Sequence, residues 1–136
     1  MDSYTRPRPN PDPEAVPYWQ SLRDHALAVQ HCVACDRYYF PPADRCATCL
    51  SAEVSWAPVS GLGAVWSHVT MHRVYRPDYE RDVPYNIAIV ELDEGPKLWT
   101  NVVDIDPADV VVGLRVRVRY DDVTDDLTLA RFVPNR

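Results

Sequence analysis

The four cysteines constrain this chain more than any other feature, because all of them lie in two Cys-x-x-Cys pairs. Cys32 and Cys35 form the first pair, and Cys46 and Cys49 form the second after a ten-residue loop. A pair with this spacing folds as a knuckle that directs both sulfurs to one point, and two facing knuckles supply the four thiolates of a structural zinc site. A rubredoxin-type iron site uses the same four ligands, so the pattern leaves zinc and iron open.

Two other uses of cysteine pairs fit the sequence less well. Two disulfides require an oxidising compartment, and no secretory signal is recognisable at the N-terminus. A thioredoxin-like redox motif is a single pair at the start of a helix in a βαβ unit, not two pairs in tandem. We therefore expect reduced, metal-binding cysteines in a cytoplasmic protein. Because four protein thiolates leave no open coordination position, the metal is expected to be structural and not catalytic.

The residue after each cysteine pair commonly needs a left-handed backbone, which glycine adopts most easily. The residues at these positions are Asp36, which tolerates that backbone, and Leu50, which tolerates it poorly. The second knuckle is therefore expected to be the less regular one.

Composition limits both the size and the partners of the chain. Its 136 residues, 46% of them hydrophobic, suit one domain with a small appendage. No run approaches the roughly 18 apolar residues that a membrane span requires. The formal net charge of −6 disfavours a nucleic-acid partner through the field of the whole protein, although a local basic patch could act against that field.

Proline and hydrophobic patterns divide the chain into three parts. Residues 1–13 carry alternating prolines and are expected to form a flexible tail, with an arm that wraps a partner subunit as the alternative. Residues 14–56 hold a helix and the four-cysteine zinc ribbon. Residues 57–136 are predicted to form an OB-fold domain.

A short amphipathic helix is predicted over Pro17–Leu27, because Trp19, Leu22 and Ala26 recur at helical spacing. Pro17 suits the first turn of this helix. A helix of about ten residues is not stable alone in water, so it must pack on the rest of the chain or on another subunit. Tyr18 and Trp19 are therefore candidate partner contacts.

The C-terminal part changes to the two-residue period of β-strands. The five strand candidates are Ala64–Tyr75, Tyr85–Leu92, Lys97–Val103, Leu114–Tyr120 and Leu127–Val133. A helical turn at Asp106 and Pro107 is predicted between the third and fourth strands. Strands in this order with a helical link after the third predict an OB-fold barrel. The fold class is therefore mainly β, with an N-terminal helix and a rubredoxin-like zinc ribbon followed by a five-stranded OB-fold barrel.

Strict alternation along the first strand separates its side chains into two sets. One side is predicted to carry Val65, Val69 and Met71, and the other Trp66, His68, Thr70 and His72. The two histidines then share a face, but no nucleophile or acidic partner stands at a useful offset from either. An independent small enzyme that uses His68, His72 or Tyr79 is therefore the weakest of the functional hypotheses.

The loop between the first two strands, residues 76–84, is longer than a hairpin needs and mixes aromatic with charged side chains. In an OB-fold this loop commonly flanks the binding face, with a solvated loop as an equal alternative. Candidate ligand or partner contacts here are Arg76, Tyr79, Arg81 and Tyr85.

Arg115, Arg117 and Arg119 alternate along the fourth strand. Such a stripe is most often the solvent face of a half-buried sheet. The alternative is contact with phosphates of a nucleic acid or of coenzyme A, because a guanidinium binds phosphate in a bidentate fork. The aspartates that follow the stripe, between residues 121 and 126, could pair with it and block that use.

Taken in order, these motifs resemble one family, the acyl-CoA-associated zinc-ribbon/OB-fold proteins once labelled domain of unknown function 35. The resemblance runs from about Pro13 to the end of the chain, and the ribbon with its Phe-Pro-Pro segment is its most specific part. The matching segments are Tyr18-Trp19, Cys32-Val33-Ala34-Cys35, Phe40-Pro41-Pro42, Cys46-Ala47-Thr48-Cys49, Trp56, Val59-Ser60-Gly61, Val90-Glu91-Leu92-Asp93-Glu94-Gly95-Pro96, and Thr100-Asn101 with Gly113.

The resemblance implies a non-catalytic accessory subunit that binds a thiolase-fold acyl-CoA enzyme and completes it in a hetero-oligomer. It implies zinc as the cofactor and an acyl-CoA substrate at the complex, with the catalytic residues on the thiolase-like subunit. The expected partner is an aldolase that cleaves a β-hydroxyacyl-CoA such as a steroid side-chain thioester. The alternative partners are acetoacetyl-CoA thiolase and hydroxymethylglutaryl-CoA synthase.

A competing hypothesis from another class is a module that binds single-stranded nucleic acid, since OB-folds and zinc ribbons both serve that use elsewhere. The acidic net charge and the lack of a recognisable basic groove with aromatic side chains argue against it. No nucleophile–base pair is recognisable in the sequence, which favours the accessory role.

Overall fold

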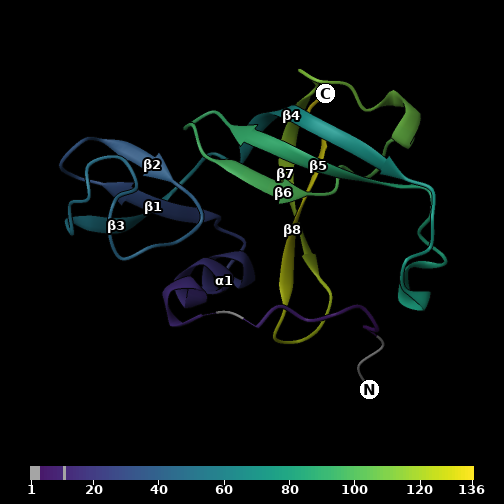
Figure 1. The fold of residues 1–136 in the computed structure, drawn as a ribbon, viewed down its shortest axis with the longest axis horizontal. Helices are drawn as coiled ribbons and strands as arrows, with labels where there is room; N and C mark the ends of the chain where they lie inside the picture. Colours follow the sequence, from purple (N-terminus) through teal and green to yellow (C-terminus); the bar gives the residue numbers. More distant parts are fainter. Residues whose placement is uncertain (1–3, 11) are drawn as a thin grey trace.

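The computed structural model describes residues 4–10 and 12–136, and its fold is mainly β with one α-helix (Figure 1). A three-stranded sheet has the order β2-β1-β3, and a five-stranded sheet has the order β6-β5-β4-β7-β8. The first sheet consists of β1 (Ala28–Cys32), β2 (Arg37–Tyr39) and β3 (Val54–Pro58). The predicted fold class is confirmed: an N-terminal helix and a ribbon precede an OB-fold sheet.

Helix α1 (Val16–Arg23) follows the short 3-10 turn η1 (Pro13–Ala15) and is shorter than predicted. It ends because His25 adopts a left-handed backbone with φ 55°, and the Ala26 N–H donates back to the Ser21 carbonyl at 2.9 Å. Ala26 is consequently exposed, and its predicted place on the packed helix face is wrong. The helix instead buries Tyr18 and Leu22.

The five-stranded sheet has the predicted strand order of an OB-fold. Its strands are β4 (Leu62–Met71), β5 (Tyr85–Leu92), β6 (Lys97–Thr100), β7 (Arg115–Asp122) and β8 (Thr128–Pro134). The 3-10 turn η2 (Pro77–Tyr79) lies between β4 and β5. The turn η3 (Pro107–Asp109) lies between β6 and β7 and is capped by the Asp106 carboxylate, as the sequence predicted. A parallel bridge between Val102 and Phe132 joins the segment after β6 to β8, so the sheet curls toward closure.

Strand β4 contains a bulge that overturns the predicted division of its side chains. The pairing with β5 shifts between Val65 and Ser67, which leaves Trp66 unpaired. Val65 faces the core opposite Val90, and His68 lies on the same side opposite the buried Ala88. The extra residue reverses the alternation, so Val69 is exposed instead of sharing a face with Val65.

The ribbon and the OB-fold sheet share one hydrophobic core. It includes Leu22 of α1, Val29 of β1 and Phe132 of β8, none of which is exposed to solvent. The Leu27 N–H also donates to the Tyr120 hydroxyl at 2.8 Å, across from the ribbon to β7. The ribbon is therefore held against the OB-fold sheet by α1.

The described part of the predicted tail contacts the loop before β5. Arg6 forms an ion pair with Asp82, and its Nε donates to the Asp82 carboxylate at 3.1 Å. The tail prediction also covers residues 1–3 and 11, which lie outside the described residues.

Candidate metal centre and OB-fold cavity

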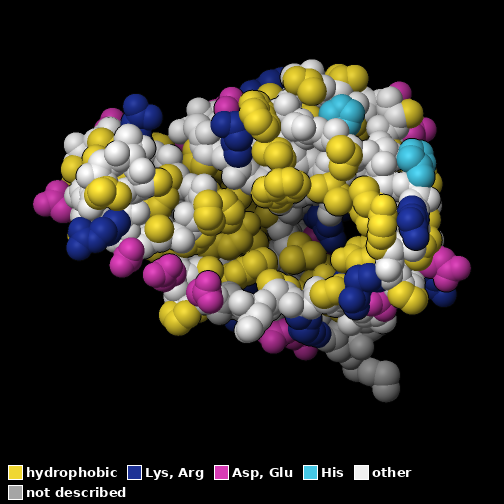
Figure 2. Space-filling view, viewed as in Figure 1, with side chains coloured by type: hydrophobic (Ala, Val, Ile, Leu, Met, Phe, Trp, Pro, Cys, Tyr) yellow, Lys and Arg dark blue, Asp and Glu magenta, His cyan; other side chains and the backbone are white. Residues whose placement is uncertain are grey.

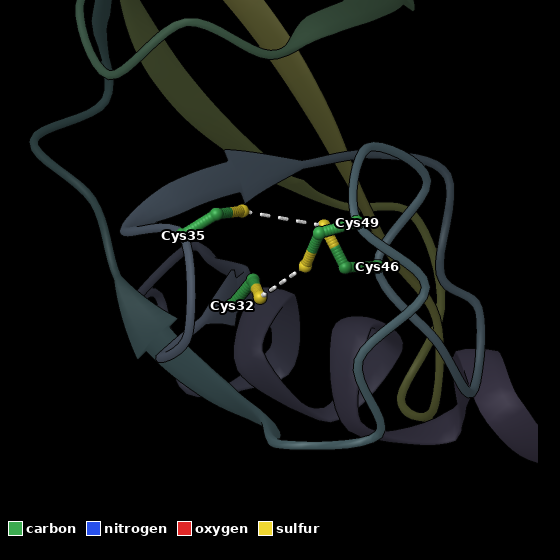
Figure 3. Close-up of side chains that lie close together, drawn as sticks. All are labelled: Cys32, Cys35, Cys46 and Cys49. Atoms are coloured by element: carbon green, nitrogen blue, oxygen red, sulfur yellow. Dashed lines mark hydrogen bonds between the residues drawn. The ribbon is translucent and has the colours of Figure 1, made fainter.

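The four cysteines converge on one point of the ribbon. Cys32 ends β1 and Cys35 lies in the turn before β2, while Cys46 and Cys49 lie in the loop between β2 and β3. Figure 3 shows the four side chains directed toward one another. All four sulfur atoms lie within 4.8 Å of one another, and the Cys32–Cys49 and Cys35–Cys46 sulfurs are 3.6 Å apart.

These distances fit a tetrahedral metal ion better than a pair of disulfides. Zinc–sulfur bonds of about 2.3 Å in a tetrahedron place the sulfurs about 3.8 Å apart. A disulfide requires about 2.05 Å between sulfurs, and all four cysteines are free. The donor set is therefore chemically suited to zinc, which would be coordinatively saturated by these four thiolates.

Both knuckles have the left-handed residue that the sequence predicted. Asp36 has φ 54° and Leu50 has φ 64°, and the Leu50 N–H donates to the Cys46 carbonyl at 2.9 Å. In the second knuckle the Thr48 N–H donates to the Cys46 sulfur at 3.3 Å. Backbone N–H groups of Cys49 and Thr48 lower the pKa of Cys46 to about 6, whereas burial and the neighbouring thiols raise the pKa of Cys35 to about 12. Cys46 is therefore the thiol of the cluster that ionises first.

The helix residues predicted as partner contacts have different surroundings. Tyr18 is only 8% exposed and packs edge-on against Trp19 and obliquely against Phe40. Burial raises the pKa of Tyr18 to about 12. Within this chain Tyr18 is a core residue, whereas Trp19 is half-buried at the edge of the same cluster.

The long loop brings two of its four candidate residues together. The rings of Tyr79 and Tyr85 stack with centroids 5.7 Å apart, and both line a cavity of about 570 Å³ at one end of the curled sheet. Arg76 pairs with Asp78 at 3.1 Å on the surface, and Arg81 is exposed. Neither Arg76 nor Arg81 belongs to the described residues that line the cavity.

Most of this cavity was not predicted from the sequence. Its wall includes Asn101, Arg119, Arg131 and Asp121, which come from the segment after β6 and from β7 and β8. Figure 2 shows a deep hollow on this face, with hydrophobic side chains around it and Lys or Arg atoms inside. In the sequence, Asn101 directly after a strand is only a weak indication of a binding site. The four wall residues come together only when the sheet curls.

The arginine stripe is largely engaged in ion pairs. Arg115 donates twice to Asp93, at 2.8 and 2.9 Å, and Arg119 donates to Asp104 at 2.8 Å. The sequence had suggested the aspartates after the stripe as partners of these arginines. The actual partners, Asp93 and Asp104, come from other loops. Arg117 is exposed.

The two histidines predicted to share a face of the first OB-fold strand have different surroundings. His68 is half-buried, and its Nδ1 has no hydrogen-bond partner within the part of the chain that the structure describes. His72 is exposed beyond the last residue of β4.

Comparison with known proteins places the chain in a family. Residues 19–55 match the family model "ChsH2, rubredoxin-like zinc ribbon domain", and residues 56–121 match "ChsH2, C-terminal OB-fold domain". The chain belongs to the ChsH2 (DUF35) family. A "DUF35 domain-containing scaffold protein" of Methanocaldococcus jannaschii is 32% identical over 85% of this DUF35 chain and 82% of the relative.

Two further similarities involve acyl-CoA enzymes. The DUF35 chain is similar to a solved chain of the "Ltp2-ChsH2(DUF35) aldolase", with TM-score 0.84 and 31% identity over 93% of this chain and 98% of that chain. It is also 33% identical, over 95% of its length, to the "Probable enoyl-CoA hydratase alpha subunit" of Thermomonospora curvata. It spans only 40% of that relative, and 39% of the "3-oxo-4,17-pregnadiene-20-carboxyl-CoA hydratase alpha subunit" of Mycobacterium tuberculosis.

No helix within residues 4–10 and 12–136 has the length and apolar content needed to cross a membrane.

Proposed function

We propose that this chain is an accessory, non-catalytic subunit that binds and completes an acyl-CoA enzyme. The observation that carries the proposal is its similarity, at TM-score 0.84 and over 98% of that chain, to a chain of an aldolase assembly. The relatives named as scaffold proteins and as alpha subunits support an assembly of unlike subunits.

The partner that we propose is a thiolase-fold aldolase that cleaves a β-hydroxyacyl-CoA, such as a steroid side-chain thioester. The aldolase name of the solved assembly supports the reaction, and the pregnadiene-carboxyl-CoA relative supports the steroid substrate. Acetoacetyl-CoA thiolase and hydroxymethylglutaryl-CoA synthase remain the alternative partners.

The arrangement of the polar side chains supports a non-catalytic role. The Asp122 carboxylate stands between His25, at 2.9 Å, and the Thr128 hydroxyl, at 2.5 Å. A nucleophile would need the imidazole beside the hydroxyl, so this order does not activate Thr128. His31 is similarly occupied by Asp36 at 2.7 Å.

The four cysteines have a structural role in this proposal. Cys32, Cys35, Cys46 and Cys49 would hold one zinc ion, with iron as the alternative, and the saturated ion would fix the loops of the ribbon. Such an ion would supply folding energy and would leave no open position for substrate. The fixed ribbon and α1 would then present a rigid surface to the partner.

Co-expression tests the accessory role. The tagged chain would be co-expressed with a thiolase-fold protein from the same genome, and the purified complex assayed for release of a carbonyl product and a shortened acyl-CoA. The expected result is a stoichiometric complex with lyase activity that neither protein has alone. A purified chain that carries nuclease-sensitive absorbance at 260 nm and no such partner would instead support the nucleic-acid-binding alternative.

The names of two relatives favour a second candidate, a subunit of an acyl-CoA hydratase. The same complex would be assayed for hydration of an enoyl-CoA. Hydration without carbon–carbon cleavage would replace the aldolase proposal and retain the accessory role.

A further inference from the structure

The cavity at the end of the curled sheet has a wall that comes from the N-terminal segment. Tyr4 and Arg6 line it together with Tyr79 and Tyr85 of the loop region. Its volume, about 570 Å³, lies within the roughly 300–1,000 Å³ range of small-molecule sites. Residues 4–8 are here called the arm. Part of the cavity wall is lost if the arm moves away from the OB-fold sheet.

Two arginines hold the arm in place. Arg6 pairs with the Asp82 carboxylate, and its guanidinium lies 5.7 Å from the centre of the Tyr79 ring. Arg8 lies 3.6 Å from the Asp126 carboxylate in the β7–β8 turn. In Figure 1 the arm runs from the N-terminus past this turn. These contacts involve side chains and no β-ladder, so the arm can detach without breaking a sheet.

The charges around the cavity indicate which ligands it suits. The arginines among its described lining residues each meet a carboxylate, in the pairs Arg6–Asp82, Arg119–Asp104 and Arg131–Asp121. These three arginines and three aspartates balance, so the wall has no net charge that would attract an anion or a cation. The remaining surface combines tyrosine rings with apolar side chains such as Val103, Ile105 and Leu129. An uncharged amphipathic molecule fits this balance.

We propose that the OB-fold cavity binds an uncharged amphipathic molecule and that the arm is a detachable part of its wall, held in place by Arg6 on Asp82. The site belongs to this chain alone and does not depend on the identity of the partner subunit. The cavity is open to solvent on one side (Figure 2), so a ligand can enter without movement of the arm. The Arg6–Asp82 pair instead keeps Tyr4 and Arg6 against the bound ligand and slows its release.

The test uses the full-length, zinc-loaded protein and Nile red, an uncharged fluorescent molecule that brightens in apolar surroundings. Stopped-flow fluorescence after dilution measures its dissociation rate, and hydroxyl-radical footprinting with mass spectrometry measures exposure of Tyr79. Arg6→Ala is expected to raise the dissociation rate about fivefold, which corresponds to loss of a part-buried ion pair and its ring contact. Oxidation of Tyr79 rises in the same variant.

Three further variants make the result specific. The exchange Arg6→Asp with Asp82→Arg is expected to restore the wild-type rate. Arg73→Ala, which removes an arginine 5.1 Å from the Tyr75 ring outside the cavity, is expected to change neither readout. Val103→Trp fills the cavity and is expected to weaken Nile red binding at least tenfold. Unchanged Nile red binding in Val103→Trp, or an unchanged rate in Arg6→Ala, would overturn the proposal.

Discussion

Removal of the Asn86 side chain is the sharpest test of how the OB-fold sheet closes. Asn86 lies in β5 and is only 4% exposed. Its Nδ2 donates to the Val102 carbonyl at 2.6 Å, and its Oδ1 accepts from the Val102 N–H at 2.8 Å. These two bonds hold the segment after β6 at the point where Val102 forms its bridge to Phe132.

Asn86→Ala lowers the free energy of unfolding because it leaves the N–H and the carbonyl of Val102 without hydrogen-bond partners. Val102 is 2% exposed, so in the wild-type fold its N–H and carbonyl are shielded from water and depend on Asn86. A buried peptide group without a hydrogen bond costs about 1–3 kcal/mol, and two on one residue should cost about 2–4 kcal/mol together. For a chain of this length the corresponding fall in Tm is about 10 °C.

Asn86→Asp gives a pH-dependent version of the same test. In its neutral form the introduced carboxylic acid can replace both bonds, but the ionised carboxylate places a lone pair against the Val102 carbonyl. Burial and this contact raise the folded-state pKa of the introduced group above the unfolded value of about 3.9. The variant should therefore be most stable below the unfolded pKa and lose stability as pH rises through the folded pKa.

The assay is urea unfolding at saturating zinc, followed by far-ultraviolet circular dichroism, with the wild type measured at each pH between 5 and 8. Asn135→Ala removes an exposed amide near the end of the chain and is expected to change the free energy of unfolding by less than about 0.5 kcal/mol. The reasoning is refuted if Asn86→Ala behaves like Asn135→Ala, or if the Asn86→Asp deficit does not change with pH.

Three other predictions address the turns, the metal and one carboxyl group. Gly61→Ala should cost about 2–4 kcal/mol in urea unfolding, because Gly61 has φ 77° and an added Cβ would lie 2.4 Å from a Val118 methyl group; Gly113→Ala, at φ 93° with open space around it, should cost only the backbone strain. Chelation of the metal should lower the free energy of unfolding by about 4 kcal/mol relative to protein in free zinc 1,000-fold above its Kd, and an unchanged transition would contradict a zinc centre. Thr128→Val should raise the pKa of Asp122, which the Thr128 hydroxyl lowers most. The variant should then lack part of the stability that the wild type has above the unfolded pKa of about 3.9, and lose less stability as pH falls through the folded pKa; carboxyl-carbon NMR titration measures the shift.

The ribbon was the most predictable part because its signals are local in sequence. Each Cys-x-x-Cys pair specifies its own knuckle, and the left-handed positions at Asp36 and Leu50 follow from the spacing. The strand order was predictable as well, since β5 and β6 are bounded by turn residues and alternate regularly. The metal itself remains a prediction, which the convergence of the sulfurs supports.

The remainder depends on contacts between residues far apart in the chain. The bulge at Trp66 adds one residue to a regular alternation, and no local pattern marks where it falls. The cavity depends on pairs such as Arg6–Asp82, which are separated by 76 residues. In the same way, the actual end of α1 depends on the left-handed turn at His25, whose ring stacks on Tyr120 with centroids 4.9 Å apart.

The shared core has a consequence for locating the partner surface. Helix α1 contacts β1 of the ribbon and both β7 and β8 of the OB-fold sheet. Loss of the metal would loosen β1, which ends at Cys32, and through α1 would disturb strands far from the centre. A Cys32→Ser variant that fails to bind the partner would therefore not place the interface on the ribbon. Surface substitutions that leave the metal content and the unfolding transition unchanged are required to distinguish a ribbon interface from one on the OB-fold sheet.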